Sequence, residues 1–553
     1  MLFLFPMPRQ KARWLPVWAF VFIKTFAPLG GSGAEAPGNI LSPSFLAAEP
    51  PKRKKSESPI YERDAKMQSA TTHVQIAIVG TGFGGLGTAI QLKRQGMNDF
   101  VVLERAGDVG GVWRDNRYPG CACDVESNLY SFSFAPNPDW SHSFSAQPEI
   151  LAYLRRCASD FGITPHICFH HEVREAVWDN QAHCWRIETT QGMYTANILV
   201  AAAGALSVPS IPELPGIAEF AGPVFHSATW DESRDLRGKR VAVVGTGASA
   251  IQFVPAIQPQ VAQLHLFQRT PAWVMPRRDR PLHWHERRLF ARFPLLQRAS
   301  RAWIYSTREL FGMGFRHPRI MKSLQQTALA HMHAAIADPE LRAKLTPNYT
   351  IGCKRILISN DYYPALAQPN VEVVTDGIAQ VRTNSIVGQD GIERPVDVII
   401  FGTGFQITDF PFAKRVRGVT GGTLSEAWAG SPRAYMGTTV TGFPNLFILQ
   451  GPNTGLGHTS VIYMIEAQIA HVVAAVRHLQ HNGLTAIEPD PQAQTQFVAD
   501  VDAMMRGTVW VDGGCQSWYL DRTGRNSSIW PDFTWNFRRR AQQFSPQAYR
   551  AIA

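Results

Sequence analysis

The sequence has no CxxC or CxxxxC pair. It holds seven cysteines, an odd number, and none follows the spacing of a zinc site. The missing motif argues against a disulfide reductase, and we predict no metal centre. Cys121 and Cys123 are too close in the sequence to form a disulfide easily. This cysteine usage is typical of a protein from a reducing cytosol.

The N-terminal segment lacks an apolar run long enough to cross a bilayer. Residues 14–23 form a run of ten, whereas a spanning helix needs about 20 apolar residues. Three interpretations of residues 1–66 stay open. They are a disordered tail or upstream start ahead of Met67, a membrane-surface anchor at residues 14–29, or an export signal with its Ala34-x-Ala36 pattern.

Most of the chain has only a small excess of positive over negative charge. Residues 1–66 supply half of the net charge of +10, and charged residues make up only 18 % of the sequence. We therefore predict no nucleic-acid partner. No repeat of 20–50 residues is present, which argues against a solenoid. With 45 % hydrophobic residues, the 553-residue chain is expected to fold into two to four packed domains of about 150 residues each.

A dinucleotide-binding fingerprint, Gly80-x-Gly82-x-x-Gly85, is the first positive signal. An apolar run at 74–79 precedes it and a helical pattern follows it. A strand, a Gly-rich turn and a helix start place a pyrophosphate at the helix N-terminus. Glu104 lies 24 positions after Gly80, where a carboxylate accepts hydrogen bonds from a ribose hydroxyl. This site is therefore predicted to bind FAD or NAD.

A second fingerprint, Gly245-x-Gly247-x-Ser249-Ala250, has a partner of opposite charge. Arg269 lies 24 positions after Gly245 and is followed by Thr270. Because an Arg attracts the 2′-phosphate that a carboxylate repels, this site is predicted to bind NADP. Two dinucleotides in one chain indicate a flavin oxidoreductase that is reduced by NADPH. Since NADPH is a cytoplasmic reductant, we expect a cytoplasmic protein, with membrane association through residues 14–29 as the alternative.

The predicted fold is α/β, with two Rossmann-like dinucleotide-binding domains and a discontinuous FAD domain. Apolar strands, proline-rich linkers and helical spacing set the predicted boundaries. The segments are an N-terminal extension at 1–70, the first part of the FAD domain at 71–216, an NADP domain at 217–395 with a helical insertion at 283–345, the second part of the FAD domain with a C-terminal loop region at 396–540, and a tail at 541–553.

Between the two fingerprints stands Phe220-x-Gly222-x-x-x-His226-x-x-x-Trp230-Asp231. This pattern resembles the signature of the type I Baeyer–Villiger monooxygenases, a branch of the flavin-containing monooxygenases. The related branch that oxygenates nitrogen and sulfur has Phe or Tyr where Trp230 stands. The alternative is that His226 and Trp230 only pack a linker.

The resemblance extends over about residues 74–540. Gly111 and Trp113 match the GGxW segment of the family, and Tyr118 and Asp124 match its NRYPG…D segment. One departure is Arg114-Asp115, where many members carry aromatic residues. The resemblance implies that NADPH reduces FAD and that a flavin C4a-peroxide then inserts one oxygen atom into a ketone or aldehyde. The product is an ester or lactone. An N- or S-oxygenating monooxygenase and a redox protein that oxygenates nothing are the alternatives.

The implied active-site residues are Arg355 and Asp124. A guanidinium stays charged at any working pH, so Arg355 can stabilise an oxyanion, and the resemblance makes Asp124 its orienting partner. An ordinary structural ion pair is the alternative. Lys354, with Arg269 and Thr270, matches the residues that hold the NADP phosphate. Trp518 matches a tryptophan on a mobile loop over NADP, and a core tryptophan is the alternative. A lipophilic organic molecule and O2 are the expected substrates. The sequence predicts no oligomeric state.

Overall fold

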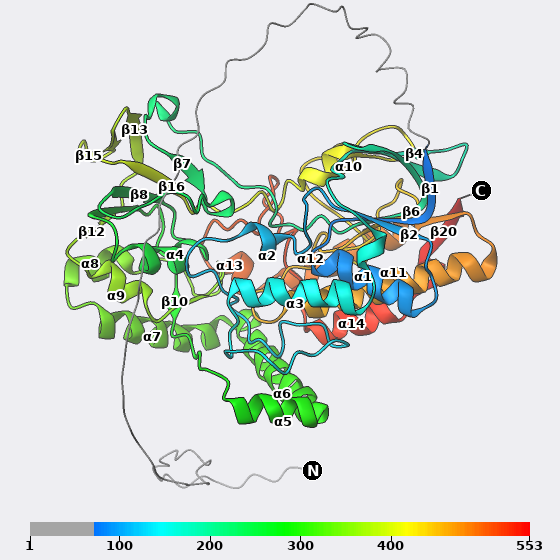
Figure 1. Ribbon diagram of the computed structural model, residues 1–553, viewed down its shortest axis with the longest axis horizontal. Coiled ribbons are helices and arrows are strands. Elements are labelled where there is room, and N and C mark those ends of the chain that lie inside the picture. The colour runs from blue at the N-terminus through cyan, green and yellow to red at the C-terminus, as the bar shows by residue number, and fades with distance from the viewer. Residues whose placement is uncertain (1–70, 553) are drawn as a thin grey trace, which may run out of the picture. The chain divides into compact units, whose positions relative to one another are not determined.

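The computed structural model describes residues 71–552, and Figure 1 shows their helices and strands. The predicted N-terminal extension lies outside these residues. A mixed sheet and a parallel sheet organise the chain, and a Gly-rich turn follows the strand Thr72–Val79 of the first and the strand Arg240–Val244 of the second. In each sheet an inner strand is apolar and buried along its whole length, Phe100–Leu103 in the first and Val398–Phe401 in the second, as expected where helices cover both faces of a sheet.

The first sheet has the strand order β17-β4-β5-β6-β1-β2-β3, and β18 pairs with the C-terminal residues 199–201 of β6, beyond the part that pairs with β5. The strands β18, β6, β1, β2 and β3 run parallel, while β4 and β5 form an antiparallel extension of β6. The bounds are β1 Thr72–Val79, β2 Phe100–Leu103, β3 Ile167–Cys168, β4 Val173–Asp179, β5 Cys184–Thr189, β6 Gly192–Ala201, β17 Val416–Arg417 and β18 Leu446–Ile448.

The second sheet is parallel throughout, with the order β12-β9-β8-β16-β7. A small antiparallel sheet, β13-β14-β15, follows β12 in the chain. The bounds are β7 Val224–His226, β8 Arg240–Val244, β9 Gln263–Phe267, β12 Val371–Val374, β13 Ile378–Arg382, β14 Ser385–Gly388, β15 Glu393–Pro395 and β16 Val398–Phe401. Two further pairs are β10 Val274–Met275 with β11 Leu357–Ile358, and β19 Ala486–Pro489 with β20 Tyr549–Ile552.

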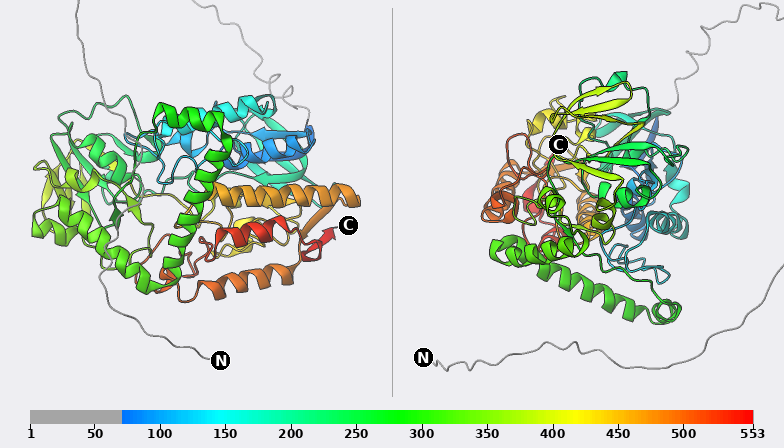
Figure 2. Two further views of the ribbon diagram at one scale, coloured as in Figure 1. Left: turned by 90° about the horizontal axis from the view of Figure 1, so that it is seen from below. Right: turned by 90° about the vertical axis from the view of Figure 1, so that its left-hand side faces the viewer.

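Helices from both halves of the chain cover the first sheet. α11 lies beside α1 and α14, as Figure 2 shows for α11 and α14. α11 begins at the capping Ser460 and ends at Gly483, which has a left-handed backbone. The helices outside the insertion are α1 Phe83–Arg94, α2 Val112–Asp115, α3 Gln147–Asp160, α4 Ala250–Ile257, α9 Tyr362–Leu366, α10 Leu424–Trp428, α11 Val461–Asn482, α12 Pro491–Met505, α13 Val509–Asp512 and α14 Thr534–Gln542.

The segment predicted as a helical insertion, 283–345, contains four helices. They are α5 Trp284–Arg292, α6 Pro294–Gly312, α7 Pro318–Ala335 and α8 Pro339–Leu345. A proline stands in the first turn of α6, α7 and α8, where the missing N–H costs nothing. Figure 1 shows α5 and α6 projecting away from both sheets.

Two predicted boundaries are wrong. The second part of the FAD domain was predicted to begin at residue 396, but β16 (Val398–Phe401) pairs with β7 and β8 and belongs to the second sheet. An apolar strand suits the centre of either sheet, so its sequence does not select the partner. The predicted tail at 541–553 contains β20, which pairs with β19.

Candidate active site

The first Gly-rich turn leaves room for a phosphate where β1 meets α1. Gly80 has φ of +98°, and a Cβ on it would lie 2.7 Å from the carbonyl oxygen of Ala202. A Cβ on Gly85 would lie 1.8 Å from the Gly80 oxygen, so α1 packs too closely on the turn for any side chain. The N-cap Gly82 provides no side-chain acceptor. The first amides of α1 are therefore available to an anion.

One cavity next to this turn is lined by five of the predicted cofactor-binding residues. They are Gly80, Gly82, Glu104, Gly111 and Trp113. The carboxyl ends of β1 and β6 and the residues Phe410 and Trp428 complete its wall. Glycine backbone, a carboxylate and apolar side chains match the phosphates, ribose and rings of a dinucleotide, so the cavity fits FAD.

Glu104 is held rigidly at the edge of this cavity. Its Oε2 accepts hydrogen bonds from the amide and the hydroxyl of Thr81, at 3.0 and 2.6 Å. Its Oε1 accepts from the Ala106 amide at 2.9 Å and pairs with Arg114 Nη1 at 2.9 Å. Arg114 also pairs with Asp115 at 2.7 Å. Arg114-Asp115, where the sequence departs from the family pattern, thus lies next to Glu104, the carboxylate predicted to bind the cofactor. Sequence reasoning missed Arg114, although that departure marked it.

The segment after α2 crosses to the second nucleotide domain. The Tyr118 hydroxyl donates to Gln252 Oε1 on α4 at 3.1 Å, and Gln252 Nε2 donates to the Ala122 carbonyl at 3.0 Å. Gly120 has φ of +79°, and a Cβ there would lie 2.7 Å from the Gln252 carbonyl. This close contact fixes the segment that ends at Asp124. Tyr118 therefore positions Asp124 through α4 and does not line the FAD cavity.

Asp124 and Arg355 meet in the structure, although 231 positions separate them. Arg355 donates to Asp124 Oδ2 from Nε at 2.9 Å and from Nη2 at 2.5 Å. Arg355 Nη1 lies 3.4 Å from the Leu456 carbonyl, which leaves guanidinium donors for another oxygen. The two side chains keep 30 % and 27 % exposure. The pair is therefore fixed but accessible.

Both charges of this pair are maintained by each other. Burial opposes ionisation of Asp124, but the charge and hydrogen bond of Arg355, together with the Arg308 charge and a backbone hydrogen bond, outweigh burial and lower the pKa of the carboxyl. Asp124 in turn raises the pKa of Arg355 against the effect of burial. A permanent cation with a fixed orientation is what an oxyanion needs.

Tyr519 lies near this pair and was missed by sequence reasoning, which selected its neighbour Trp518. The Tyr519 side chain is fully buried, and its hydroxyl has no hydrogen-bond partner among the described residues. Burial raises its pKa to about 12, and the Arg355 charge offsets part of the rise. The Tyr519 hydroxyl is therefore a buried, neutral hydrogen-bond donor near Arg355 that has no acceptor among the described residues.

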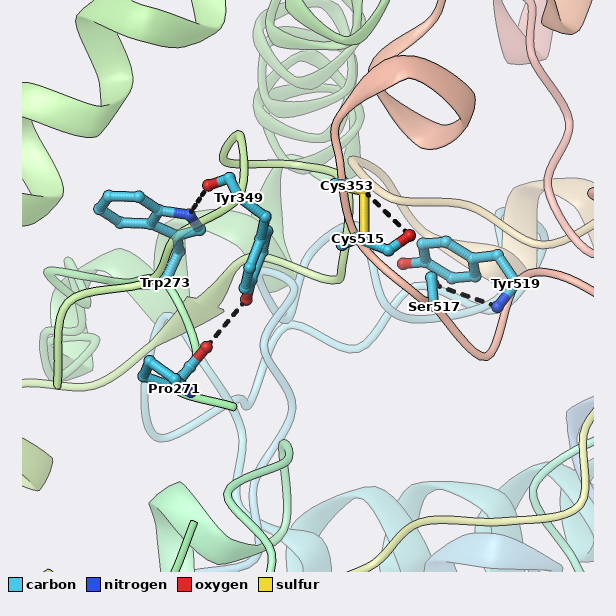
Figure 3. Close-up of a disulfide and its surroundings, with 7 residues drawn as sticks. All are labelled: Pro271, Trp273, Tyr349, Cys353, Cys515, Ser517 and Tyr519. Atoms are coloured by element: carbon cyan, nitrogen blue, oxygen red, sulfur yellow. Dashed lines mark hydrogen bonds between the residues drawn. A yellow bond between two sulfur atoms is a disulfide. The ribbon is translucent and has the colours of Figure 1, made fainter. Parts of the chain in front are cut away.

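A disulfide joins Cys353 to Cys515 (Figure 3). It ties the segment before Arg355 to the loop that carries Trp518 and Tyr519. The cysteine spacing gave no sign of it, since 162 residues separate the two partners. Cys121 and Cys123 are free and buried, as are Cys157 and Cys184. Trp518 is 46 % exposed, so it is not a core tryptophan. Its ring lies edge-on to that of Tyr519, with 4.2 Å between the ring centres.

The second Gly-rich turn repeats the geometry of the first. Gly245 has φ of +105°, and a Cβ on it would lie 2.6 Å from the Gly402 carbonyl. Gly247 follows, and the N-cap Ser249 makes no side-chain hydrogen bond to α4. The turn therefore also offers free amides at a helix start.

Two cations converge near this turn. Arg269 follows β9 and is exposed, and Lys354 is half-buried with its Nζ 5.1 Å from the ring centre of Tyr349. Burial lowers the pKa of Lys354, and the Arg269 charge lowers it further. Within residues 71–552, neither cation has an ion-pair partner. Two neighbouring cations without an acid match a phosphate. Thr270 adjoins them and accepts a hydrogen bond from Thr246 at its carbonyl, at 3.1 Å.

The Phe220–Asp231 signature packs the edge of the second sheet. His226 ends β7 opposite Phe401, and its ring lies edge-on to Phe405 at 5.5 Å. Burial lowers its pKa. Trp230 packs on Phe253 of α4 at 5.4 Å. Of the remaining signature residues, Phe220 is buried in the core, and a Cβ on Gly222 would lie 2.3 Å from the Asp397 carbonyl. Asp231 accepts hydrogen bonds from its neighbours Ser233 and Arg234.

No signature residue lines the FAD cavity. The residues from His226 to Trp230 instead join β7 to α4 and to the loop after β16. The signature therefore packs against the strand and helix that flank the second Gly-rich turn. Over residues 71–552, no group of His, Cys, Asp or Glu is arranged to hold a metal ion. The helices of the same stretch include none that is long and apolar enough to cross a membrane.

Comparisons with known proteins identify the family. Residues 77–285 match the model described as pyridine nucleotide-disulphide oxidoreductase. The chain is 51 % identical over 490 residues to a Baeyer–Villiger monooxygenase of Streptomyces coelicolor, and the match covers 88 % of this chain and 94 % of that protein. The chain belongs to the Baeyer–Villiger monooxygenases.

Solved structures of this enzyme class have the same fold. Cyclohexanone monooxygenase from Rhodococcus sp. Phi1 bound to NADP+ is 28 % identical, with a TM-score of 0.78 over 87 % of this chain and 99 % of that one. The OTEMO complex with FAD and NADP is 27 % identical, with a TM-score of 0.78 over 86 % of this chain and 99 % of that one. The predicted family, the α/β fold and the monooxygenase class are confirmed.

Proposed function

We propose that this Baeyer–Villiger monooxygenase uses FAD, NADPH and O2 to convert a lipophilic ketone into an ester or lactone. The observation that carries the proposal is the Asp124–Arg355 ion pair. It is held at fixed distance, keeps its charges and has free donors next to Lys354, one of the two cations at the NADP site. The ketone class rests on family membership.

The chain's own groups hold the cofactors. The α1 amides and Glu104 are placed to bind the pyrophosphate and ribose of FAD, while Arg269 and Lys354 are placed to bind the phosphate of NADPH. When bound, NADPH supplies hydride to FAD, and reduced FAD activates O2. Arg355 then stabilises negative charge on the substrate oxygen, because its guanidinium stays protonated and Asp124 fixes its orientation.

Product analysis tests this function. Purified protein is mixed with NADPH, O2 and, in turn, cyclohexanone, a linear ketone, a sulfide and a tertiary amine, and the products are identified by mass spectrometry. We expect an ester or lactone from at least one ketone. An N-oxide or sulfoxide alone would identify a heteroatom oxygenase. Consumption of NADPH without any oxygenated product would identify a redox protein.

The cytoplasm is the proposed location, because NADPH is available there. The Cys353–Cys515 disulfide is uncommon for that compartment. Cys353 is buried, whereas Cys515 is half-buried. Fractionation of the source cells, with the protein detected by antibody, tests this location. Recovery from an exported fraction would contradict it.

A further inference from the structure

α6 exposes its apolar side to solvent. Leu295, Trp303 and Leu310 are 74 %, 72 % and 65 % exposed. Ala299 and Trp303 follow Leu295 at intervals of four residues and Leu310 lies seven residues after Trp303, so these side chains share one side of the helix with Ala302. A helix on the surface of a globular protein normally turns such a stripe toward the core.

The inward side of α6 carries polar side chains as well as Ile304 and Tyr305, which pack against the core, and specific hydrogen bonds fix this side toward the protein. Gln297 is 3 % exposed and donates to Asn128 Oδ1 at 3.0 Å and to the Asn137 carbonyl at 2.6 Å. Arg301 Nη1 donates to backbone carbonyls, among them that of Leu129 at 3.0 Å.

Two further inward residues hold the C-terminal half of the helix. Arg308 pairs with Glu126 at 2.7 Å, and Glu309 accepts the Thr534 hydroxyl at 2.5 Å. Because these bonds set the rotation of α6, the apolar stripe cannot turn inward without breaking them.

The exposed apolar surface continues into α5. Trp284 is 68 % exposed and Phe293, between the two helices, is 54 % exposed. We call Trp284, Phe293, Leu295, Trp303 and Leu310 the α5–α6 face. Figures 1 and 2 show α5 and α6 at the margin of the described part, with no other element over α5. Single apolar residues on a surface are common, whereas several large ones on two consecutive helices are typical of an interaction site.

The charges around this face are positive. Arg288, Arg292 and Arg298 are exposed and take part in no ion pair within residues 71–552. Between residues 284 and 322 the only acids are Glu286, which pairs with Arg280 at 2.7 Å, and the buried Glu309. An uncompensated cationic rim around exposed Trp, Leu and Phe matches the interface of an anionic bilayer.

We propose that the α5–α6 face docks on membranes that contain anionic phospholipids. A second copy of the chain fits less well, because a two-fold contact would bring the same cations face to face. The two tryptophans suit the headgroup region, where an amphipathic ring is stable. The described helices do not span a bilayer, so the contact is with the membrane surface. This inference does not depend on the proposed function.

Vesicle flotation of the full-length protein tests it. The vesicles contain phosphatidylcholine alone or phosphatidylcholine with phosphatidylglycerol. We expect binding at least about tenfold stronger to the anionic vesicles, and its loss in about 0.5 M NaCl. The double variant Leu295→Ser/Trp303→Ser should bind about tenfold more weakly, because it removes two of the most exposed apolar groups. Arg292→Gln/Arg298→Gln should weaken binding to anionic vesicles and leave binding to neutral ones unchanged.

Ile392→Ser is the matched control, because Ile392 is 55 % exposed but lies between β14 and β15. It should bind like the wild type, and all variants should retain flavin and NADPH oxidation. Absence of wild-type flotation overturns the proposal. Equal flotation of Leu295→Ser/Trp303→Ser also overturns it, since binding would then come from another part of the chain. A dimer in light scattering that this variant dissociates, without vesicle binding, would assign the face to a second copy.

Discussion

At the scale of single residues, the two nucleotide sites differ in the sign of one side chain. Glu104 follows β2 and Arg269 follows β9, the strands next to the two Gly-rich turns. Glu104 is held by Thr81 and Arg114, whereas Arg269 is exposed beside Lys354. The second site therefore presents cations, which attract a phosphate, and the first presents a carboxylate, which repels one. The sequence predicts this difference because both residues stand at a fixed distance from their glycines.

The preference for NADPH is tested at Arg269. Each charged contact to a phosphate contributes about 1.5–3 kcal/mol, so NADPH should be preferred over NADH by a factor on the order of tens or more. Arg269→Ala should raise KM for NADPH by a similar factor and leave KM for NADH nearly unchanged. Steady-state kinetics with both cofactors measures this. An equal loss with NADPH and NADH would show that Arg269 does not hold the phosphate.

The oxygen-transfer role is tested at Arg355. Loss of one such electrostatic donor typically costs about 100-fold or more, so Arg355→Ala should still bind FAD while product formation falls by that factor. Since Arg355 lies beside Lys354, flavin reduction can also slow, so the decisive quantity is product formed per NADPH consumed. Arg355→Lys keeps the positive charge but lacks the forked donors of the guanidinium. Its product yield per NADPH should lie between those of the wild type and Arg355→Ala. A variant that keeps wild-type coupling and yield would make the ion pair purely structural.

At the scale of elements, the sequence predicts turns and helices better than it predicts which strands pair and which helix side faces the protein. The glycines at 80 and 245 predict their turns, because their positive φ and the nearby carbonyls exclude side chains. The sheet to which β16 belongs is decided by tertiary pairing. The outward apolar stripe of α6 has the periodicity of any amphipathic helix, so only its hydrogen bonds show which side faces the protein. The meeting of Asp124 with Arg355 was predicted by resemblance and not by spacing.

The Cys353–Cys515 disulfide, which joins two segments of the chain, can be tested by counting free thiols. Unfolded protein without reductant should show five free thiols, and seven after reduction. Cys515→Ser should lower the free energy of unfolding by about 2–4 kcal/mol, because it removes a cross-link that closes a long loop. Reductant should destabilise the wild type and not this variant. The matched control Cys168→Ser changes a free cysteine and should keep the reductant effect. Seven free thiols before reduction would show that the bridge does not form.

At the scale of the whole molecule, both sheets are built from residues after Met67. The first sheet begins with β1 at Thr72, which lies between β6 and β2 in its centre, and the second sheet lies entirely within residues 224–401. Each nucleotide turn takes its close contacts from described residues, such as Ala202 for Gly80 and Gly402 for Gly245. Residues of the described part therefore supply the close contacts of both turns.

A chain that begins at Met67 should accordingly fold, bind FAD and turn over like the full-length protein. Flavin content, thermal unfolding and NADPH oxidation measure this. Its flotation with anionic vesicles should also persist, because the α5–α6 face lies at residues 284–310. An insoluble or flavin-free product would show that the N-terminal residues belong to the fold. Full activity with lost flotation would place the membrane contact in residues 1–66, where the basic and apolar segment at 9–24 could supply it.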